Sequence, residues 1–578
     1  MQKTALGTNR DVFQADLAEK QQLIRVAMGL APAELVLKNA VYLNVFSNEW
    51  LTGDIAVQGN RIAGVGSYSG KREIDLAGKI LSPGLIDAHI HLESSLVSPA
   101  EFARAVLRAG TTAVVTDPHE IANVMGKDGI QYMLEATENL PIDVFFMLPS
   151  CVPATPQDES GARLSFADIE AFYQNPRVRG LAEMMDYPGV ANANAEPLLK
   201  ILAARQHGHP VDGHAPLLSG QALNAYVAAG IHSDHECSNP DEALEKLRCG
   251  HFIMIREGTA AKNLDALLPL LCEQYASRCL FATDDKHPED LLLTGHIDGM
   301  VRRAVHAGVD PVFALKAASF NAAQYFGLQD KGAIAPGYFA DLVVFDNLTD
   351  FTVQQVYKNG TLMFDSGKVC DFADPPVSEA LRQRALDTFH LPPVTPASFQ
   401  TNQPLPVLQI IKNQLMTEKC GTADKIDIKK DILKIAVVER HHNTGHIGIG
   451  YIHGYGLTAG AVATSIAHDA HNIIAVGCSD EELSAAVNQI IQNKGGMCVV
   501  KGTQVLSEVP LPVAGLMSDK PLSTVNEQLE TAKKAASALG VPEGIDPFMT
   551  LSFVSLPVIP KLRLTTKGMF DVQTQSYL

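Results

Sequence analysis

The sequence predicts an α/β protein built around a (β/α)8 barrel of the TIM type. Three observations support this prediction. Residues 81–330 repeat a pattern of apolar strand, loop and helix, as a barrel requires. Short alternating strands at 34–65 and 331–364 predict a small β-sandwich domain built from both sides of the barrel. Mixed strand and helix patterns after the barrel predict a C-terminal α+β domain.

Composition limits the classes of function. The chain has 578 residues, of which 46% are hydrophobic and 19% charged, which is typical of a globular protein with sizeable cores. Its formal net charge of −18 disfavours nucleic acids and anionic membranes as partners. The start of the chain has no apolar signal core, and no apolar run is long enough for a bilayer. Nine scattered cysteines fit a reducing compartment. We expect a cytoplasmic enzyme with a small-molecule substrate, assembled as a homo-oligomer with a dimer as the first guess.

In chain order, a charged stretch at 11–29 with apolar Leu17, Leu23, Ile24 and Val26 predicts a surface helix. It precedes the first sandwich strands. A stretch from Asp371 to about Pro404, rich in Pro, Ala and Gln, predicts a linker. We expect these segments: residues 1–80, helix and first part of the sandwich; 81–330, barrel; 331–375, second part of the sandwich; 376–405, linker; 406–578, C-terminal domain.

Eight barrel strands are predicted, and the short fifth and sixth have weak periodicity. Helical stretches such as Pro99–Ala109 and Pro197–Arg205 lie between them. In the C-terminal domain, strands are predicted at Ile435–Val438 and Ile473–Val476, and a helix at Glu481–Asn493. The eight strands are Ile80–His91, Thr112–Thr116, Asp143–Leu148, Gly180–Met185, Val211–His214, Ile231–Asp234, Phe252–Arg256 and Leu280–Asp284.

The first strand ends in His89 and His91. Side chains alternate along a strand, so residues i and i+2 point the same way and both imidazoles can reach one point. Neutral imidazole is the commonest metal ligand and suits zinc, iron, manganese or nickel. The alternative is a pair of hydrogen-bonded histidines at a strand end, and the spacing alone does not decide between the two.

Polar residues also end most of the other strands. Active sites of barrels lie at the carboxyl ends of the strands, so all of these side chains should meet at one mouth. Each alone has a structural explanation, but buried charges that converge must be paired or bind metal. The set therefore favours a metal site. It comprises Asp117, His119 and Glu120 after strand two, Glu183 in strand four, His214 at the end of strand five, His232, Asp234, His235 and Glu236 in or just after strand six, Arg256 and Glu257 at strand seven, and Asp284 and Asp285 at strand eight.

The run Pro83–His91 resembles the first-strand signature of the amidohydrolase superfamily. More narrowly, the chain resembles the bacterial adenine deaminase family over nearly its whole length. The resemblance implies hydrolytic deamination of free adenine to hypoxanthine and ammonia in purine salvage. The stretches that carry it are Ala182–Val190, Val211–Pro216, Ser233–Glu236, Ala282–Asp285, His468–Asn472 and Ala514–Ser518.

Strand four distinguishes this chain from many two-metal relatives, which bridge their metals with a carboxylated lysine. Here strand four offers Glu183 and no nearby lysine. A glutamate can bridge two divalent ions, and the resemblance implies that this one does. We assign the first metal to His89, His91 and Asp284, and the second to His214 and His235, with Glu183 shared. Nitrogen and oxygen ligands admit iron, manganese or zinc, and the resemblance favours iron(II) or manganese(II) over zinc.

The mechanistic hypothesis follows from this assignment. A metal lowers the pKa of its bound water to about 7, which makes a nucleophile for C6 of adenine. Asp284 is the candidate to accept the proton and pass it to the leaving amine. Ring nitrogen N1 needs a proton donor, for which Glu120 and His119 are candidates, with Glu120 slightly preferred. The nucleic-acid deaminase signature His-x-Glu with Pro-Cys-x-x-Cys is absent from the sequence.

Three questions stay open at the level of sequence. The main alternative activity is hydrolysis of a cyclic amide or amidine by the same metals, as in dihydroorotase-like or hydantoinase-like relatives. A catalytically dead scaffold is another class, although all six proposed ligands are present. In the C-terminal domain, His468 and His471 could close over the barrel mouth, hold a further metal, or be plain polar residues of a glycine-rich domain.

Overall fold

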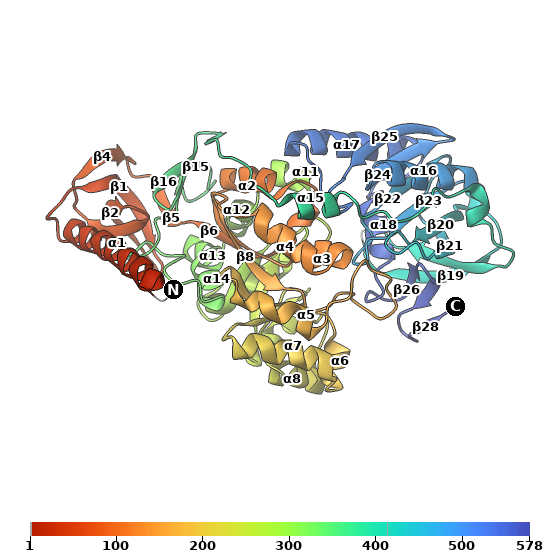
Figure 1. Ribbon diagram of the computed structural model, residues 1–578, viewed down its shortest axis with the longest axis horizontal. Helices are drawn as coiled ribbons and strands as arrows, with labels where there is room; N and C mark the ends of the chain where they lie inside the picture. Colours follow the sequence, from red (N-terminus) through yellow and green to blue (C-terminus); the bar gives the residue numbers. More distant parts are fainter. Residues whose placement is uncertain (1–2, 413) are drawn as a thin grey trace.

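The computed structural model describes residues 3–412 and 414–578, and Figure 1 shows three regions in a row. A curled sheet with the N-terminal helix lies at one end, the barrel in the middle, and the C-terminal region at the other end. The predicted fold class is confirmed: a parallel α/β barrel with additional sheet regions on its two sides. Among the described residues, no helix is both long and apolar enough to cross a bilayer.

The barrel strands form two parallel runs, in the orders β10-β9-β8-β7-β6 and β11-β12-β13. Two seams join the runs into a ring. At one, Asp284 N–H donates to His89 O at 2.9 Å. At the other, His232 N–H donates to Val211 O at 3.3 Å. The strands are β6 (Leu85–Ile90), β7 (Thr111–Thr116), β8 (Asp143–Leu148), β9 (Val178–Met184), β10 (Val211–Gly213), β11 (Ser233–Asp234), β12 (Phe252–Arg256) and β13 (Cys279–Ala282).

Local sequence signals explain where several barrel helices begin. Ser98 precedes Pro99, and its side chain accepts from the N–H of Glu101 at the start of α2 (Pro99–Arg108). Likewise, Asn239 precedes Pro240, and its side chain accepts from the N–H of Glu242 at the start of α9 (Pro240–Arg248). A polar N-cap followed by proline at the first helical position satisfies free N–H groups and presets the backbone. The other barrel helices include α3 (His119–Met125), α4 (Lys127–Ala136), α7 (Ala195–Gln206), α8 (Gly220–Ala228) and α12 (Ile297–His306).

The predicted first strand, Ile80–His91, is wrong as a single element. The structure divides it into β5 (Ile80–Pro83), which joins the flanking sheet, and β6, which joins the barrel. Gly84 lies between them, and its N–H donates to Asp341 O at 2.8 Å. A Cβ at Gly84 would lie 2.1 Å from Thr112 Oγ1. The chain changes sheets here because only glycine lets the first barrel strand approach the second this closely.

This close approach gives a prediction for stability. Replacing Gly84 with alanine should lower the free energy of unfolding by about 1–3 kcal/mol, because the added methyl group must displace Thr112. Gly53→Ala is the matched control, since a Cβ there meets backbone only at 3.6 Å. Urea unfolding of both variants measures the difference. Equal stability of the two variants would contradict the packing at Gly84.

Strands from both flanks of the barrel form one nine-stranded sheet, as the sequence predicted, in the order β17-β16-β15-β14-β5-β1-β2-β3, with β4 paired to β1. The sheet curls so far that Arg61 forms a bridge with Phe339. An apolar core lies inside the curl. The strands are β1 (Ala33–Asn44), β2 (Glu49–Gln58), β3 (Arg61–Gly66), β4 (Gly70–Asp75), β14 (Leu342–Phe345), β15 (Val353–Lys358), β16 (Thr361–Asp365) and β17 (Lys368–Val369).

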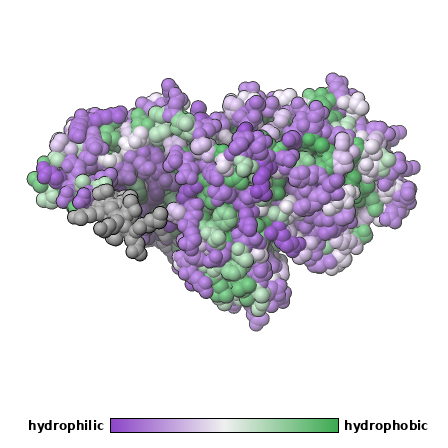
Figure 2. All heavy atoms as spheres, in the orientation of Figure 1, coloured by the Kyte–Doolittle hydropathy of each residue, from purple (hydrophilic) through white to green (hydrophobic). Residues whose placement is uncertain are grey.

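The N-terminal helix α1 (Lys3–Ala27) begins earlier and ends earlier than the predicted range 11–29. Leu23 and Val26 pack against the sheet, whereas Leu17 and Ile24 are exposed. Figure 2 shows a mostly hydrophilic face with an apolar area low on the barrel, in the region where Figure 1 labels α7 and α8. Leu199 and Leu202 of α7 are exposed.

The C-terminal region contains an eight-stranded sheet in the order β19-β18-β21-β20-β23-β22-β24-β25 and a small sheet β26-β27-β28. The predicted linker also contains α15 (Glu379–Ala385) and a 3-10 turn at Pro396–Phe399. Helices α16 (Asp480–Gln492), α17 (Leu522–Ala538) and α18 (Met549–Val554) accompany the sheets. The strands are β18 (Leu405–Ile410), β19 (Thr417–Ala423), β20 (Leu433–Val438), β21 (Ile447–His453), β22 (Ala461–Thr464), β23 (Ile473–Gly477), β24 (Gly496–Lys501), β25 (Gln504–Pro510), β26 (Leu562–Thr565), β27 (Gly568–Asp571) and β28 (Ser576–Tyr577).

Candidate metal centre and active site

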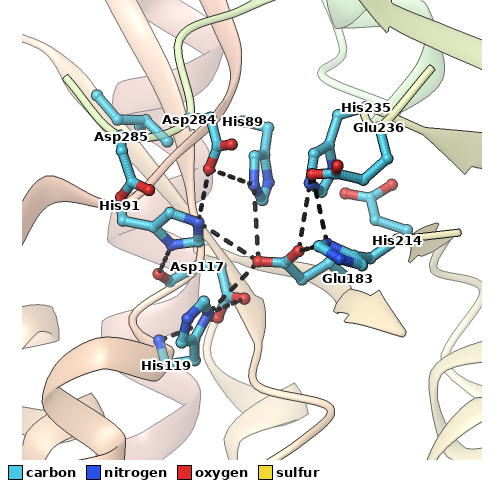
Figure 3. Close-up of polar contacts among 12 residues, drawn as sticks. His89, His91, Asp117, His119, Glu183, His214, His235, Glu236, Asp284 and Asp285 are labelled. Atoms are coloured by element: carbon cyan, nitrogen blue, oxygen red, sulfur yellow. Dashed lines mark hydrogen bonds and ion pairs between the residues drawn. The ribbon is translucent and has the colours of Figure 1, made fainter. Parts of the chain in front are cut away.

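The six side chains proposed as metal ligands meet at the carboxyl ends of the barrel strands (Figure 3). They come from five different strands, and five of the six are buried. Those strands are far apart in sequence, so only closure of the barrel brings the side chains together. The six are His89 in β6 and His91 just after it, Glu183 in β9, His214 after β10, His235 after β11, and Asp284 after β13.

Glu183 lies in the middle of the group, and its two oxygens face different partners (Figure 3). Oε1 is 3.4 Å from His91 Nε2 and 3.8 Å from His89 Nε2. Oε2 is 2.7 Å from His214 Nδ1 and 3.3 Å from His235 Nε2. Ligand atoms that share one metal at bonds of about 2.1 Å lie about 3.0–3.4 Å apart. In each pair one separation falls in this range, 3.4 Å to His91 and 3.3 Å to His235, and each oxygen of the one carboxylate faces a different pair of imidazoles.

Asp284 completes the half of the group that contains His89 and His91. Its Oδ1 is 3.0 Å from His91 Nε2 and 3.6 Å from His89 Nε2. The backbone of Asp284 has φ of +60°, a left-handed conformation that aspartate and asparagine tolerate better than most residues. The turn after β13 therefore aims this carboxylate back across the barrel mouth.

Two observations fit this group to divalent metal. His89 Nε2 is buried and has no hydrogen-bond partner within residues 3–412 and 414–578, which is costly unless another ligand takes its lone pair. His91 Nδ1 lies 3.0 Å from Asp117 O, so the carbonyl can hold a proton on Nδ1 and leave Nε2 free. The residues present therefore fit divalent metal. Their oxygen and nitrogen donors, with no thiolate among them, do not distinguish iron or manganese from zinc.

Arg256, at the end of β12, holds the other side of Asp284. Its Nη1 donates to Asp284 Oδ2 at 2.6 Å and also forms an ion pair with Glu236. Burial alone would raise the pKa of Asp284, but the positive charge of Arg256 and the imidazole of His91, 3.0 Å from Oδ1, hold it well below its usual value. Arg256 thus keeps Asp284 ionised while leaving Oδ1 directed at the two histidines.

Glu236, Arg256 and Asp117 belong to this site, although from the sequence we predicted only that each lies at or near a strand end. Glu236 Oε1 lies 3.2 Å from His235 Nε2, so Glu236 could serve as a further ligand beside His214 and His235. Glu236 directly follows His235 in the sequence, and this adjacency could have indicated that it lies near the metal ligands. Cys237, two residues after His235, is buried, and its Sγ donates to Asp234 Oδ2 at 3.2 Å.

The two candidate proton donors after β7 lie on the first turn of α3. His119 Nδ1 is 2.8 Å from Asp117 Oδ2 and 3.6 Å from Glu183 Oε1, so it borders the metal ligands. His119 Nε2 is 3.5 Å from Glu120 Oε1. Burial alone would raise the pKa of Glu120, but positive charges on neighbouring histidines hold it well below its usual value. Glu120 is therefore ionised in the resting protein.

Comparison with known proteins agrees with this geometry. Residues 409–576 match the family described as "Adenine deaminase C-terminal domain", and residues 80–363 match the "Amidohydrolase family". The chain is 49% identical to "Adenine deaminase 2" of Carboxydothermus hydrogenoformans over 96% of this chain and 98% of that protein. The chain belongs to the adenine deaminase family. The predicted family is thereby confirmed.

Other relatives extend this comparison. An adenine deaminase of Desulfatibacillum aliphaticivorans is 49% identical over 96% of this chain and 99% of that protein. Among solved structures, the β-aspartyl dipeptidase of Fervidobacterium islandicum AW-1 aligns with 59% of this chain and 99% of that chain, at 18% identity and a TM-score of 0.46. The adenine deaminase family match thus spans the curled sheet, the barrel and the C-terminal region together.

Proposed function

We propose that this chain catalyses the hydrolytic deamination of adenine to hypoxanthine and ammonia. The observation that carries the proposal is the position of Glu183, with one carboxylate oxygen toward each pair of histidines. Identity of 42–49% to adenine deaminases over 96% of the chain selects the substrate among the reactions that such a site could perform. The reaction takes up one water and breaks the bond between C6 and the exocyclic nitrogen.

We assign His89, His91 and Asp284 to one divalent ion and His214 and His235 to the other, with Glu183 shared. Iron(II) or manganese(II) is the proposed native metal, which the thiolate-free donor set permits. When bound, the ions would supply a water whose pKa is lowered to about 7 and which can attack C6. All other steps fall to side chains of the protein.

Asp284 is the proposed proton carrier at C6. Its ionised carboxylate can accept a proton from the attacking water. The ion pair with Arg256 makes the protonated form of Asp284 a stronger acid, which favours transfer of the proton to the leaving amine. The same residue can therefore act first as base and then as acid.

At the other side of the ring, N1 must gain a proton as C6 becomes tetrahedral. Glu120 remains the preferred group, with His119 as the alternative. Because Glu120 is ionised in the resting protein, it would have to receive a proton before it could pass one to N1. Both residues lie on the first turn of α3, and His119 Nδ1 is 3.6 Å from Oε1 of the proposed bridging carboxylate.

The test is a substrate screen with manganese- or iron-loaded protein, comparing free adenine with dihydroorotate and hydantoin. Ammonia release and the appearance of hypoxanthine should both be seen with adenine. The Glu183→Gln protein, prepared in parallel, controls for contaminating deaminases. Inert adenine together with opening of a cyclic amide would overturn the proposal in favour of a cyclic amide hydrolase.

We further propose that the protein acts in purine salvage in the cytoplasm, as a homo-oligomer. Exposed apolar side chains on α1, Phe13 and Leu17 among them, support self-association because such side chains gain from burial. Light scattering of the purified chain measures the number of subunits. A monomer at micromolar concentration would remove the oligomer from the proposal.

A further inference from the structure

The loop between β22 and β23 of the C-terminal region reaches the mouth of the barrel. Two of its side chains end on one barrel residue, Glu120. His468 Nδ1 lies 2.8 Å from Glu120 Oε1, and His471 Nε2 contacts Oε2 directly. All three side chains are buried. Both oxygens of a barrel carboxylate are therefore occupied by histidines that lie more than three hundred residues later in the chain.

The backbone around His471 is fixed by an arginine with no exposed surface. Arg440 Nε donates to the carbonyl of His471, and its Nη2 donates to Ala514 O at 2.9 Å. Its Nη1 donates to Thr388 O at 3.1 Å. His471 itself has φ of +53°, which is unfavourable for a histidine and persists only where surrounding contacts impose it.

His468 is held from the opposite side. Its ring stacks on Phe553 of α18, with centroids 4.7 Å apart and planes 17° from parallel. Its backbone N–H donates to Ser552 O at 2.9 Å. Asn472 then ties the end of the loop to the barrel, because its Nδ2 donates to Glu159 O at 2.9 Å. The rotamers of both histidines are thus set by packing and hydrogen bonds before any substrate arrives.

Charge explains why Glu120 needs these partners. Burial lowers the pKa of His468, but Glu120 outweighs it and raises the value to about 9, so His468 is cationic at neutral pH. The cation compensates the buried carboxylate, which would otherwise be costly.

We propose that the C-terminal domain completes the active site of this enzyme: His468 and His471 are positioning residues that hold both oxygens of Glu120 at the barrel mouth. The inference rests on the proposed function, in which Glu120 faces the purine ring. It gives the C-terminal domain a role in turnover that the barrel alone cannot supply. In this proposal the two histidines act through Glu120. The three side chains also lie close enough together to surround a cation, so the metal content of the variants separates positioning from metal binding.

The test is a double-mutant cycle in the full-length, manganese-loaded protein. His468→Ala and His471→Ala should each lower kcat for adenine by about 10–100-fold, the range typical of residues that orient a catalytic group. Bound manganese should stay at the wild-type level. In the Glu120→Gln background, neither alanine substitution should lower kcat further, because the group they position has already lost its charge.

Conservative variants separate positioning from folding. Asparagine at 468 can place an amide N–H near the position of Nδ1, and glutamine at 471 can do so for Nε2. His468→Asn and His471→Gln should therefore recover part of the lost kcat, whereas His468→Leu and His471→Leu should not. His453→Ala is the matched control, because His453 bonds to Gln409 within the C-terminal region and should leave kcat unchanged.

Three results would overturn the inference: wild-type kcat in both alanine variants, effects that add fully to Glu120→Gln, or loss of manganese in step with activity. The last result would make the cluster a metal site instead. Failure of the proposed function is a separate outcome, since wild-type protein would then not release ammonia from adenine. The same variants would in that case be measured on whichever substrate the screen had identified.

Discussion

Replacing Glu183 with glutamine should abolish deamination, with kcat/KM lower by at least about 10³-fold, because loss of the bridge removes several kcal/mol of transition-state stabilisation. Glutamine keeps the shape of glutamate but offers one oxygen and no charge. Glutamine therefore cannot place one charged oxygen at each of the two metal positions. We expect fewer than two ions per chain to stay bound after desalting. Elemental analysis and an adenine assay on the same preparation measure both effects.

The control for this variant is Glu138→Gln, at an exposed position after α4. It should keep wild-type activity and metal content. Because glutamine matches the volume of Glu183, circular dichroism and thermal melting should show a folded protein. Two tightly held ions and normal turnover in Glu183→Gln would show that Glu183 is no bridge.

Replacing Asp284 with asparagine should lower kcat by about 10²–10⁴-fold, the contribution typical of a group that transfers protons. Asparagine is the right substitute because it also tolerates the φ of +60° at this position, so little stability should be lost. Ammonia release from adenine measures the effect. Normal release by this variant would show that Asp284 carries no proton.

Metal content distinguishes the two roles of Asp284. If Asp284→Asn keeps two ions and kcat is still low, the loss of activity comes from the missing proton transfer. If the variant loses one ion, the loss of activity comes from the missing metal ligand. Asp265→Asn is the matched control, since Asp265 is exposed and pairs with Arg303. Its activity should equal that of the wild type.

The sequence allowed the ligand set to be proposed because strand geometry is local. His89 and His91 share a face by their spacing, and barrel closure then places every strand end at one rim. The predicted first strand is too long because its apolar run continues through Gly84, where only the close approach to Thr112 shows that the chain changes sheets.

Other parts of the site depend on contacts that no short stretch of sequence contains. Arg256 contacts Asp284 because the seventh and eighth strands lie side by side. No local sequence pattern around either residue predicts this ion pair. The contact of His468 and His471 with Glu120 depends on how the C-terminal region sits on the barrel. From the sequence, closure of His468 and His471 over the barrel mouth was one of three possibilities, beside a further metal site and plain polar residues.

We propose that one carboxylate, Glu183, joins two cations held by side chains from five strands. Anomalous diffraction from crystals of the manganese-loaded protein tests it most directly. We expect two peaks, one on each side of the Glu183 carboxylate, each within about 2.0–2.2 Å of its ligands. A single peak, or two peaks of which one is out of reach of Glu183, would contradict it.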